Sequence, residues 1–180
     1  MEATQEFAWV GGDVNFLRTN LRTAYYKPFL FNSVILGLRG RYGHVDGIDE
    51  KVSQAGRFFL GGRQVRGFDG GCIGPRDIGT QSAVGGNNFY SGSIEVISNL
   101  GLSDDLGVRW TVFSDFGSVW GTDYPEGVVG ANDSKTRKSV GFGILWDTAV
   151  GQLTFYWADA ISKTSDDKLK RFQFNIGTRF

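Results

Sequence analysis

The stretch VRWTVFSDFGSVW, residues 108–120, decides the fold class of this chain. Its even positions include Trp110, Val112 and Phe116, whereas Thr111 and Asp115 occupy odd positions between them. Side chains of a β-strand point alternately to its two faces, so a period of two predicts a strand with one apolar and one polar face.

The same period recurs on both sides of this stretch. Six further strands are expected at residues 13–27, 32–44, 88–98, 139–147, 151–160 and 170–180. The composition agrees, because 27 Gly and 15 Phe with only 3 Pro favour strands and tight turns. Residues 1–12 are weakly patterned, although Phe7, Trp9 and Val10 could add a short strand. No segment reads as a credible amphipathic helix.

The connections between the expected strands differ greatly in length. A brief turn is expected at Lys27-Pro28, a very long connection at 45–84 and a modest one at 99–107. Further along, the connections are long at 121–136, very short at 148–150 and longer at 161–169. Short turns at one rim and long loops at the other are typical of bacterial outer-membrane barrels.

Charged residues crowd the polar faces of these strands. The expected inward set is Arg18, Arg22, Arg39, Arg41, Glu95, Arg109, Asp115, Arg171 and Arg179. In the core of a soluble sandwich each poorly paired ion would cost on the order of several kcal/mol, which the wet interior of a barrel avoids. Aromatic residues near strand ends fit girdles at the two membrane interfaces, with a soluble aromatic core as the alternative. The girdle set is Tyr25, Tyr26, Trp110, Trp120, Trp146, Trp157 and Phe180.

Overall composition excludes several other classes. The formal net charge is +0, which gives no argument for nucleic acid as a partner. A run of about eighteen apolar residues, as a transmembrane helix needs, does not occur, and the mean hydropathy of −0.19 suits barrel strands. The start of the chain lacks a signal sequence, so any export signal is expected in sequence not present here.

Enzyme chemistry finds no support in the residue types. Single Cys72 and single His44 provide neither an internal disulfide nor a Cys/His zinc site, and no Ser/His/Asp grouping can form around that histidine. Gly62 to Gly67 is followed by Phe68 rather than by the Lys and Ser/Thr of a phosphate-binding loop. The sequence therefore predicts a protein that is not an enzyme and has no cofactor and no metal.

Within the longest connection, residues 61–71 read GGRQVRGFDGG. Five of these eleven residues are glycine, yet Arg63, Arg66, Phe68 and Asp69 lie among them. Such a mixture suits a loop whose backbone bends tightly while one or two charged side chains reach a definite partner.

A family resemblance enters through the order and spacing of several motifs. They are Arg57-Phe58-Phe59-Leu60-Gly61-Gly62, Val65-Arg66-Gly67-Phe68, Gly74-Pro75-Arg76-Asp77, Ala83-Val84-Gly85-Gly86-Asn87, Ser93-Ile94-Glu95 and Phe113-Ser114-Asp115-Phe116-Gly117-Ser118-Val119-Trp120. With these motifs and the aromatic terminus at Phe180, the chain resembles the BamA-like outer-membrane assembly factors. That superfamily also includes TamA and the two-partner secretion transporters. The resemblance covers roughly residues 11–180.

The resemblance implies a role for the glycine-rich stretch as the tip of a lid loop that folds back into the barrel lumen. Its motif is Val65, Arg66, Gly67 and Phe68. By resemblance, Arg66 pairs with acidic residues of the inner wall, which map onto Glu95 and Asp115. The alternation of the strands places both carboxylates on the lumen face independently. A purely structural plug is an equally good interpretation of this cluster.

The last expected strand resembles the C-terminal targeting signal of the same family. Its signal residues are Phe172, Phe174, Ile176 and Phe180. Such a strand has a lipid-facing apolar side and an unpaired edge, so it can be recognised by strand addition.

The expected architecture is therefore all-β, an antiparallel transmembrane β-barrel present as a C-terminal fragment of about seven to eight strands with a long lid loop. Residues 1–180 would form this part of the barrel domain, with two strands in 13–44, the lid loop in 45–84 and five strands in 85–180. A sheet of this size has two raw edges, so it should close only by recruiting residues 1–12 or by self-association with another copy.

The implied function is to fold and insert β-barrel proteins into the bacterial outer membrane without chemical catalysis. The alternative is the polypeptide-translocating pore of a two-partner secretion system. The implied partners are outer-membrane lipids, nascent outer-membrane proteins and, through missing periplasmic domains, accessory assembly lipoproteins.

Overall fold

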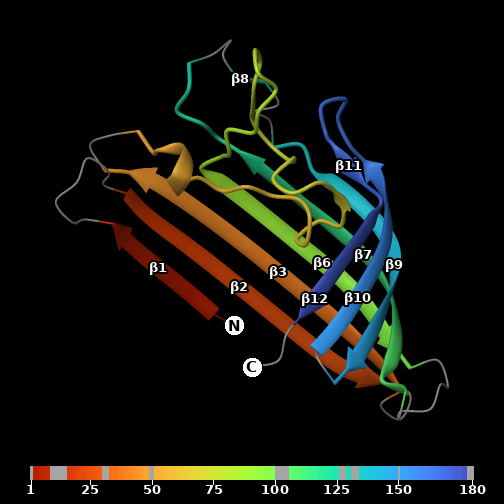
Figure 1. Cartoon of the computed structure of the whole chain (residues 1–180). Helices are drawn as coiled ribbons and strands as arrows, with labels where there is room; N and C mark the ends of the chain where they lie inside the picture. Colours follow the sequence, from red (N-terminus) through yellow and green to blue (C-terminus); the bar gives the residue numbers. More distant parts are fainter. Residues whose placement is uncertain are drawn as a thin grey trace.

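In a computed structural model of the chain, one antiparallel sheet of eight strands dominates the molecule (Figure 1). The structure describes residues 2–8, 16–29, 33–48, 51–99, 106–125, 129–130, 134–149 and 151–177. In sheet order the strands are β1 (Glu2–Ala8), β2 (Phe16–Phe29), β3 (Val34–Gly47), β6 (Asn88–Ser98), β7 (Val108–Trp120), β9 (Arg137–Thr148), β10 (Gly151–Ser162) and β12 (Phe172–Gly177). The all-β, antiparallel fold class expected from the sequence is confirmed. No helix in the described residues is long and apolar enough to cross a membrane.

Much of the connection between β3 and β6, residues 48–87, lies inside the curve of the sheet, and a segment near residue 80 extends past the strand ends (Figure 1). We call these residues the lid loop. They contain the short 3-10 helix η1 (Gln54–Gly56) and the two-residue strands β4 (Gly67–Phe68) and β5 (Arg76–Asp77). β4 pairs with β11 (Leu169–Lys170), and β5 pairs with β8 (Val129–Gly130).

Two strand boundaries differ from the sequence expectation. Residues 2–8 form β1 and pair with β2, whereas Trp9 and Val10 lie outside the described residues. The turn expected at Lys27-Pro28 is wrong, because β2 continues to Phe29 and Pro28 pairs with Ile35. The pairing of β1 with β2 ends at Arg22. Proline lacks a backbone N–H, and it is tolerated here because this end of β2 has β3 as its single described neighbour.

The two faces of the sheet differ as the alternation predicts. Exposed apolar residues cover the outer face, among them Ile94, Phe142 and Trp146, whereas Thr111 and Ser139 are buried on the inner face. One expected girdle residue is misplaced: a Cβ at inward-facing Gly37 would lie 2.9 Å from the ring of Tyr26, so this tyrosine lies on the inner face.

Arg171 was expected on the inner wall and is found elsewhere. Its Nε lies 2.7 Å from Oδ1 of Asp159, and both side chains are largely exposed. Asp159 occupies an odd position of β10, on the same face as Trp157. The alternation misleads here because Arg171 lies in the break between β11 and β12. Arg179 lies outside the described residues.

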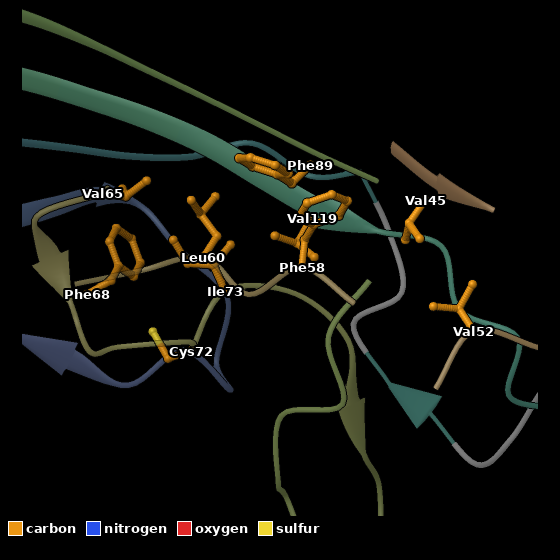
Figure 2. Close-up of a cluster of buried hydrophobic side chains, with 10 residues drawn as sticks. All are labelled: Val45, Val52, Phe58, Leu60, Val65, Phe68, Cys72, Ile73, Phe89 and Val119. Atoms are coloured by element: carbon orange, nitrogen blue, oxygen red, sulfur yellow. The ribbon is translucent and has the colours of Figure 1, made fainter. Parts of the chain in front are cut away.

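The hydrophobic core lies between the lid loop and the inner face of the sheet (Figure 2). Its members are Val45, Val52, Phe58, Leu60, Val65, Phe68, Cys72, Ile73, Phe89 and Val119. The rings of Phe58 and Phe89 lie 4.7 Å apart between centroids. Gly43 makes room for this pair, because a Cβ there would lie 2.2 Å from Phe89 and 2.7 Å from Phe58. Burial of apolar surface thus fixes the lid loop against the wall.

Candidate functional site

The candidate site begins where the lid loop turns toward the wall at Gly67. This residue has φ of 91°, a conformation that disfavours side chains, and a Cβ there would lie 3.2 Å from the Cβ of Ala158 on β10. Glycine therefore lets the loop backbone approach the wall closely. The preceding residue, Arg66, is then directed at β6 and β7.

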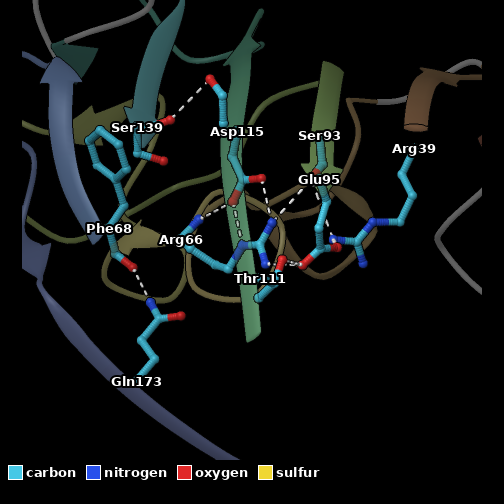
Figure 3. Close-up of polar contacts among 10 residues, drawn as sticks. Arg39, Arg66, Phe68, Ser93, Glu95, Thr111, Asp115, Ser139 and Gln173 are labelled. Atoms are coloured by element: carbon cyan, nitrogen blue, oxygen red, sulfur yellow. Dashed lines mark hydrogen bonds and ion pairs between the residues drawn. The ribbon is translucent and has the colours of Figure 1, made fainter. Parts of the chain in front are cut away.

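Arg66 makes the densest set of polar contacts in the site (Figure 3). Its Nε and Nη2 donate to Oδ2 and Oδ1 of Asp115 at 2.7 and 2.8 Å, a bidentate pair. Its Nη1 donates to Oε1 of Glu95 at 3.0 Å, and Nη2 also donates to Oγ of Ser93 at 3.1 Å. The Arg66 backbone N–H donates to Oδ2 of Asp115 at 3.0 Å. The guanidinium is therefore held by charge-assisted bonds to two strands.

Burial from water strengthens the electrostatic contacts of Arg66. The side chains of Arg66, Asp115 and Glu95 are 3%, 1% and 7% exposed. Burial alone would lower the pKa of Arg66, but the hydrogen bond and charge of Asp115, followed by those of Glu95, outweigh it and raise that pKa. The raised pKa favours the charged form of Arg66 in this site.

Two aromatic rings complete the surroundings of the guanidinium. Its Cζ lies 3.3 Å from the ring centroid of Phe113 and 4.8 Å from that of Tyr156. A cation over an aromatic face is attracted by the ring quadrupole. Sequence reasoning missed both residues, although Phe113 shares the inward parity of Thr111 and Asp115 and could have been found by that signal.

The charges of the site balance one another across the contact between the lid loop and the wall. Arg39 on β3 donates from Nη2 to Oε2 of Glu95 at 3.0 Å, and Thr111 donates its hydroxyl to Oε1 of Glu95 at 2.9 Å. Two arginines therefore face two carboxylates. We call Arg39, Arg66, Glu95 and Asp115 the anchor cluster. The structure thus brings Arg66 together with both acidic residues that the sequence analysis expected beside it.

The lid loop also contacts the last strand, which sequence reasoning did not anticipate. β4 pairs with β11, and Asp69 N–H donates to the Lys168 carbonyl at 2.8 Å. Gln173 Nε2 donates to the Phe68 carbonyl at 3.1 Å (Figure 3), and Arg63 Nε donates to Oδ1 of Asn175 at 2.8 Å. Gln173 and Asn175 occupy the inward positions of β12, and that parity is the signal that could have found them.

The expected C-terminal signal residues lie on the opposite face of β12. Phe172, Phe174 and Ile176 are 45%, 47% and 54% exposed. The rings of Phe172 and Phe174 lie 5.2 and 5.0 Å from Trp157 and Phe155 of β10. These residues form an apolar outer surface apart from the anchor cluster. Phe180 lies outside the described residues.

Within the described ranges, no group of three or more His, Cys, Asp or Glu residues could hold a metal ion. The carboxylates of the anchor cluster are engaged by arginines, and this arrangement suits holding a loop in place.

The chain therefore has the wall of a β-barrel and a lid loop that an arginine anchors to its inner face. Comparisons with known proteins assign this arrangement to a class of outer-membrane barrel proteins. The Omp85 superfamily domain matches residues 1–180, and the chain belongs to that superfamily.

Among its relatives are BamA proteins. The chain is 35% identical over 176 residues to the outer membrane protein assembly factor BamA of Neorickettsia risticii, covering 97% of this chain and 23% of that protein. It is 29% identical over 169 residues to BamA of Neisseria meningitidis serogroup B, covering 81% and 21%. The human sorting and assembly machinery component 50 homolog is 29% identical over 134 residues, covering 71% and 28%.

A solved structure agrees. The crystal structure of BamA from Haemophilus ducreyi lacking POTRA domains 1-3 matches with a TM-score of 0.84 and 25% identity, over 96% of this chain and 36% of that one. The chain spans less than a quarter of the BamA relatives named above. It corresponds to the C-terminal part of a BamA-type barrel, and its location is the bacterial outer membrane.

Proposed function

We propose that this chain is the barrel portion of an outer-membrane assembly factor that folds and inserts β-barrel proteins without chemical catalysis. Likeness to BamA carries the proposal: the relatives named as assembly factors match most of this chain, and so does the Haemophilus ducreyi fold. In this proposal residues 1–180 form one part of a barrel domain, with the lid loop as its insertion.

In this role the wall would act through physical contacts. Substrate strands would meet the membrane beside an exposed apolar outer face and pair at a strand edge, so burial of lipid-facing side chains and edge hydrogen bonds would drive insertion. β12 supports this view, because β10 is its single strand neighbour in the described sheet. The motif of Val65, Arg66, Gly67 and Phe68 would hold the lid loop in the lumen during that process.

The partners follow from the same proposal. They are outer-membrane lipids, nascent outer-membrane proteins and accessory assembly lipoproteins, the last through domains beyond this chain. The polypeptide-translocating pore of two-partner secretion is not favoured, because the relatives named above are assembly factors.

Reconstitution tests the proposal. The chain is placed in vesicles of bacterial lipids, and the folding of a small barrel protein is followed by its heat-modifiable gel migration. Faster folding than in empty vesicles is expected. If the barrel protein folds equally fast with and without the chain, and an unfolded polypeptide passes into the vesicles, the chain is a transport pore and not an assembly factor.

A further inference from the structure

A cavity of about 800 Å³ lies beside the anchor cluster, between the tip of the lid loop and the inner wall. Residues of the lid-loop tip, β3, β6 and β12 line it. Its described lining residues include four cations, Arg39, Arg41, Arg63 and Lys170, and one carboxylate, Asp69. The cavity is therefore positively charged and rich in hydrogen-bond donors.

The wall arginines are poorly neutralised by the chain itself. Arg41 stands directly opposite Arg22 in the register of β2 and β3, and like charges in that position repel. In the part of the chain that the structure describes, neither residue has an ion pair, although Glu2 is opposite Arg22 in the β1–β2 register. Two adjacent inward cations are thus left without carboxylates.

The remaining cations of the cavity keep donors available. Arg39 is 43% exposed and shares Glu95 with Arg66. Arg63 uses Nε for Asn175, and its guanidinium forms no ion pair with any residue that the structure describes. Oδ1 of Asp69 accepts from the backbone N–H of Gly70 at 2.9 Å, so this lone carboxylate is already partly engaged.

We propose that this cavity binds an extended acidic polypeptide segment with carboxylates on alternate residues. Arg39 and Arg41 are two positions apart on β3, so their Cα atoms repeat at about 7 Å, which is also the repeat of alternate side chains in an extended segment. The guanidinium of Arg41 can fork two hydrogen bonds to one carboxylate, whereas Arg39, whose Nη2 donates to Glu95 and Ser93, offers its remaining N–H groups to the next one. The cavity thus matches both the sign and the spacing of such a segment.

Neutral polar groups beside the arginines suit a peptide rather than a compact anion. Gln64, Gln173 and Asn175 line the cavity, and each amide side chain offers donors and acceptors to a backbone. An inorganic phosphate would engage the cations and leave these groups unused. The inference rests on the proposed function for the source of the segment, which would be a strand of a substrate barrel protein.

Fluorescence polarisation tests the site on the full chain folded in detergent micelles. The probe is a labelled short peptide in which Asp alternates with Thr. One comparison peptide carries Asn in place of Asp, and another has the same composition with all Asp in one block. The variants are Arg41→Gln and, as a matched control, Arg171→Gln, which removes an arginine of the outer face.

The alternating peptide should bind, and Arg41→Gln should weaken it by about tenfold, the effect of losing one charge-assisted pair, whereas Arg171→Gln should leave it unchanged. Heat-modifiable migration checks folding, and Lys170→Gln replaces Arg41→Gln if the latter does not fold. Equal binding by wild type and Arg41→Gln would overturn the site. Equal binding of the blocked peptide, or complete displacement by inorganic phosphate, would overturn the extended acidic ligand.

Vesicle insertion is measured separately, so the two proposals can fail independently. Peptide binding without any insertion activity would reject the assembly function and keep the site. Insertion by wild type without peptide binding would reject the peptide site and keep the assembly function.

Discussion

At the scale of single residues, Arg66 is the side chain on which the lid loop depends most. Arg66 forms a bidentate ion pair with Asp115 on β7 and a second ion pair with Glu95 on the neighbouring strand β6. Removing one partner of a buried ion pair leaves the other charge stranded, at a cost of roughly 3–5 kcal/mol. Arg63, by contrast, is joined to Asn175 by one exposed hydrogen bond.

Arg66→Ala should therefore loosen the lid loop much more than Arg63→Ala does. Limited proteolysis of the folded chain measures this, with cleavage expected within residues 48–87 and faster in Arg66→Ala. Arg66→Lys serves as a further comparison, because lysine keeps the charge but cannot form the bidentate fork. Equal cleavage rates for the alanine variants would count against Arg66 as the anchor.

Cys72 offers a second readout of the same loop. Its thiol donates to the Lys168 carbonyl at 3.1 Å, and it is the one cysteine of the sequence. Burial first, and then the charge of Asp167, raises the pKa of this thiol above its ordinary value. A raised pKa leaves less thiolate at a given pH, and the thiolate is the reactive form.

Alkylation of Cys72 near pH 8 should consequently be slow in the folded chain. The rate should increase only at higher pH than for a free cysteine, whose pKa is about 8.5. Arg66→Ala should accelerate the reaction because it releases the loop that covers the thiol. If Cys72 of the folded wild type were labelled as fast as Cys72 of the unfolded chain, the loop would not protect the thiol.

At the scale of elements, hydrogen bonds join the lid loop to β11 and β12 at the end of the chain. β4 pairs with β11, and Gln173 of β12 donates to the Phe68 carbonyl next to Arg66. Movement of the lid-loop tip must therefore break hydrogen bonds to the segment that leads into β12. This link connects the anchored motif to the strand that carries Phe172, Phe174 and Ile176, which the sequence analysis expected to act as a C-terminal signal.

Gln173→Ala should weaken this link. It removes one of the two donors to the buried Phe68 carbonyl, which still accepts from the Gly62 N–H, so the loss is about 0.5–1.5 kcal/mol. Hydrogen exchange should rise both in residues 67–69 and in β12. Gln152→Ala is the matched control, because this glutamine of β10 donates to Asp147 instead. Faster exchange in β12 alone would mean that the two elements are not coupled.

The sequence predicted the strands better than the contacts between them. A period of two shows which face Phe113 and Tyr156 share, but not that both rings meet one guanidinium, because that depends on how neighbouring strands and the loop are placed. The β4–β11 pair joins segments far apart in the sequence and leaves no local signal. The predictions at Pro28 and Arg171 were wrong because a local rule failed at each position. Proline is tolerated where one edge of β2 is unpaired in the described sheet, and the alternation of faces is interrupted at Arg171 by the break between β11 and β12.

At the scale of the whole molecule, the lid loop takes the place of a conventional core. The apolar cluster and the anchor cluster both join this loop to the inner wall, while exposed apolar side chains cover the outer face. An Omp85 barrel wall built in this way presents an apolar outer face and keeps the charges of the anchor cluster on its inner face.

The sheet that the structure describes ends at β1 and β12. Unpaired strand edges favour association, so the 180-residue chain expressed by itself should form more than monomers in detergent. Light scattering coupled to size exclusion measures the protein mass in the complex. A strict monomer would show that the edges are satisfied within one copy.

We expect the lid loop anchored by Arg66 to support the insertion of barrel proteins. The most direct test of this expectation is the folding rate of a small barrel protein in vesicles that contain wild type, Arg66→Ala or Arg63→Ala at equal protein density. Arg66→Ala should slow folding toward the rate of empty vesicles, whereas Arg63→Ala should stay close to wild type. Wild-type rates for Arg66→Ala, with its lid loop shown by proteolysis to be released, would contradict this expectation.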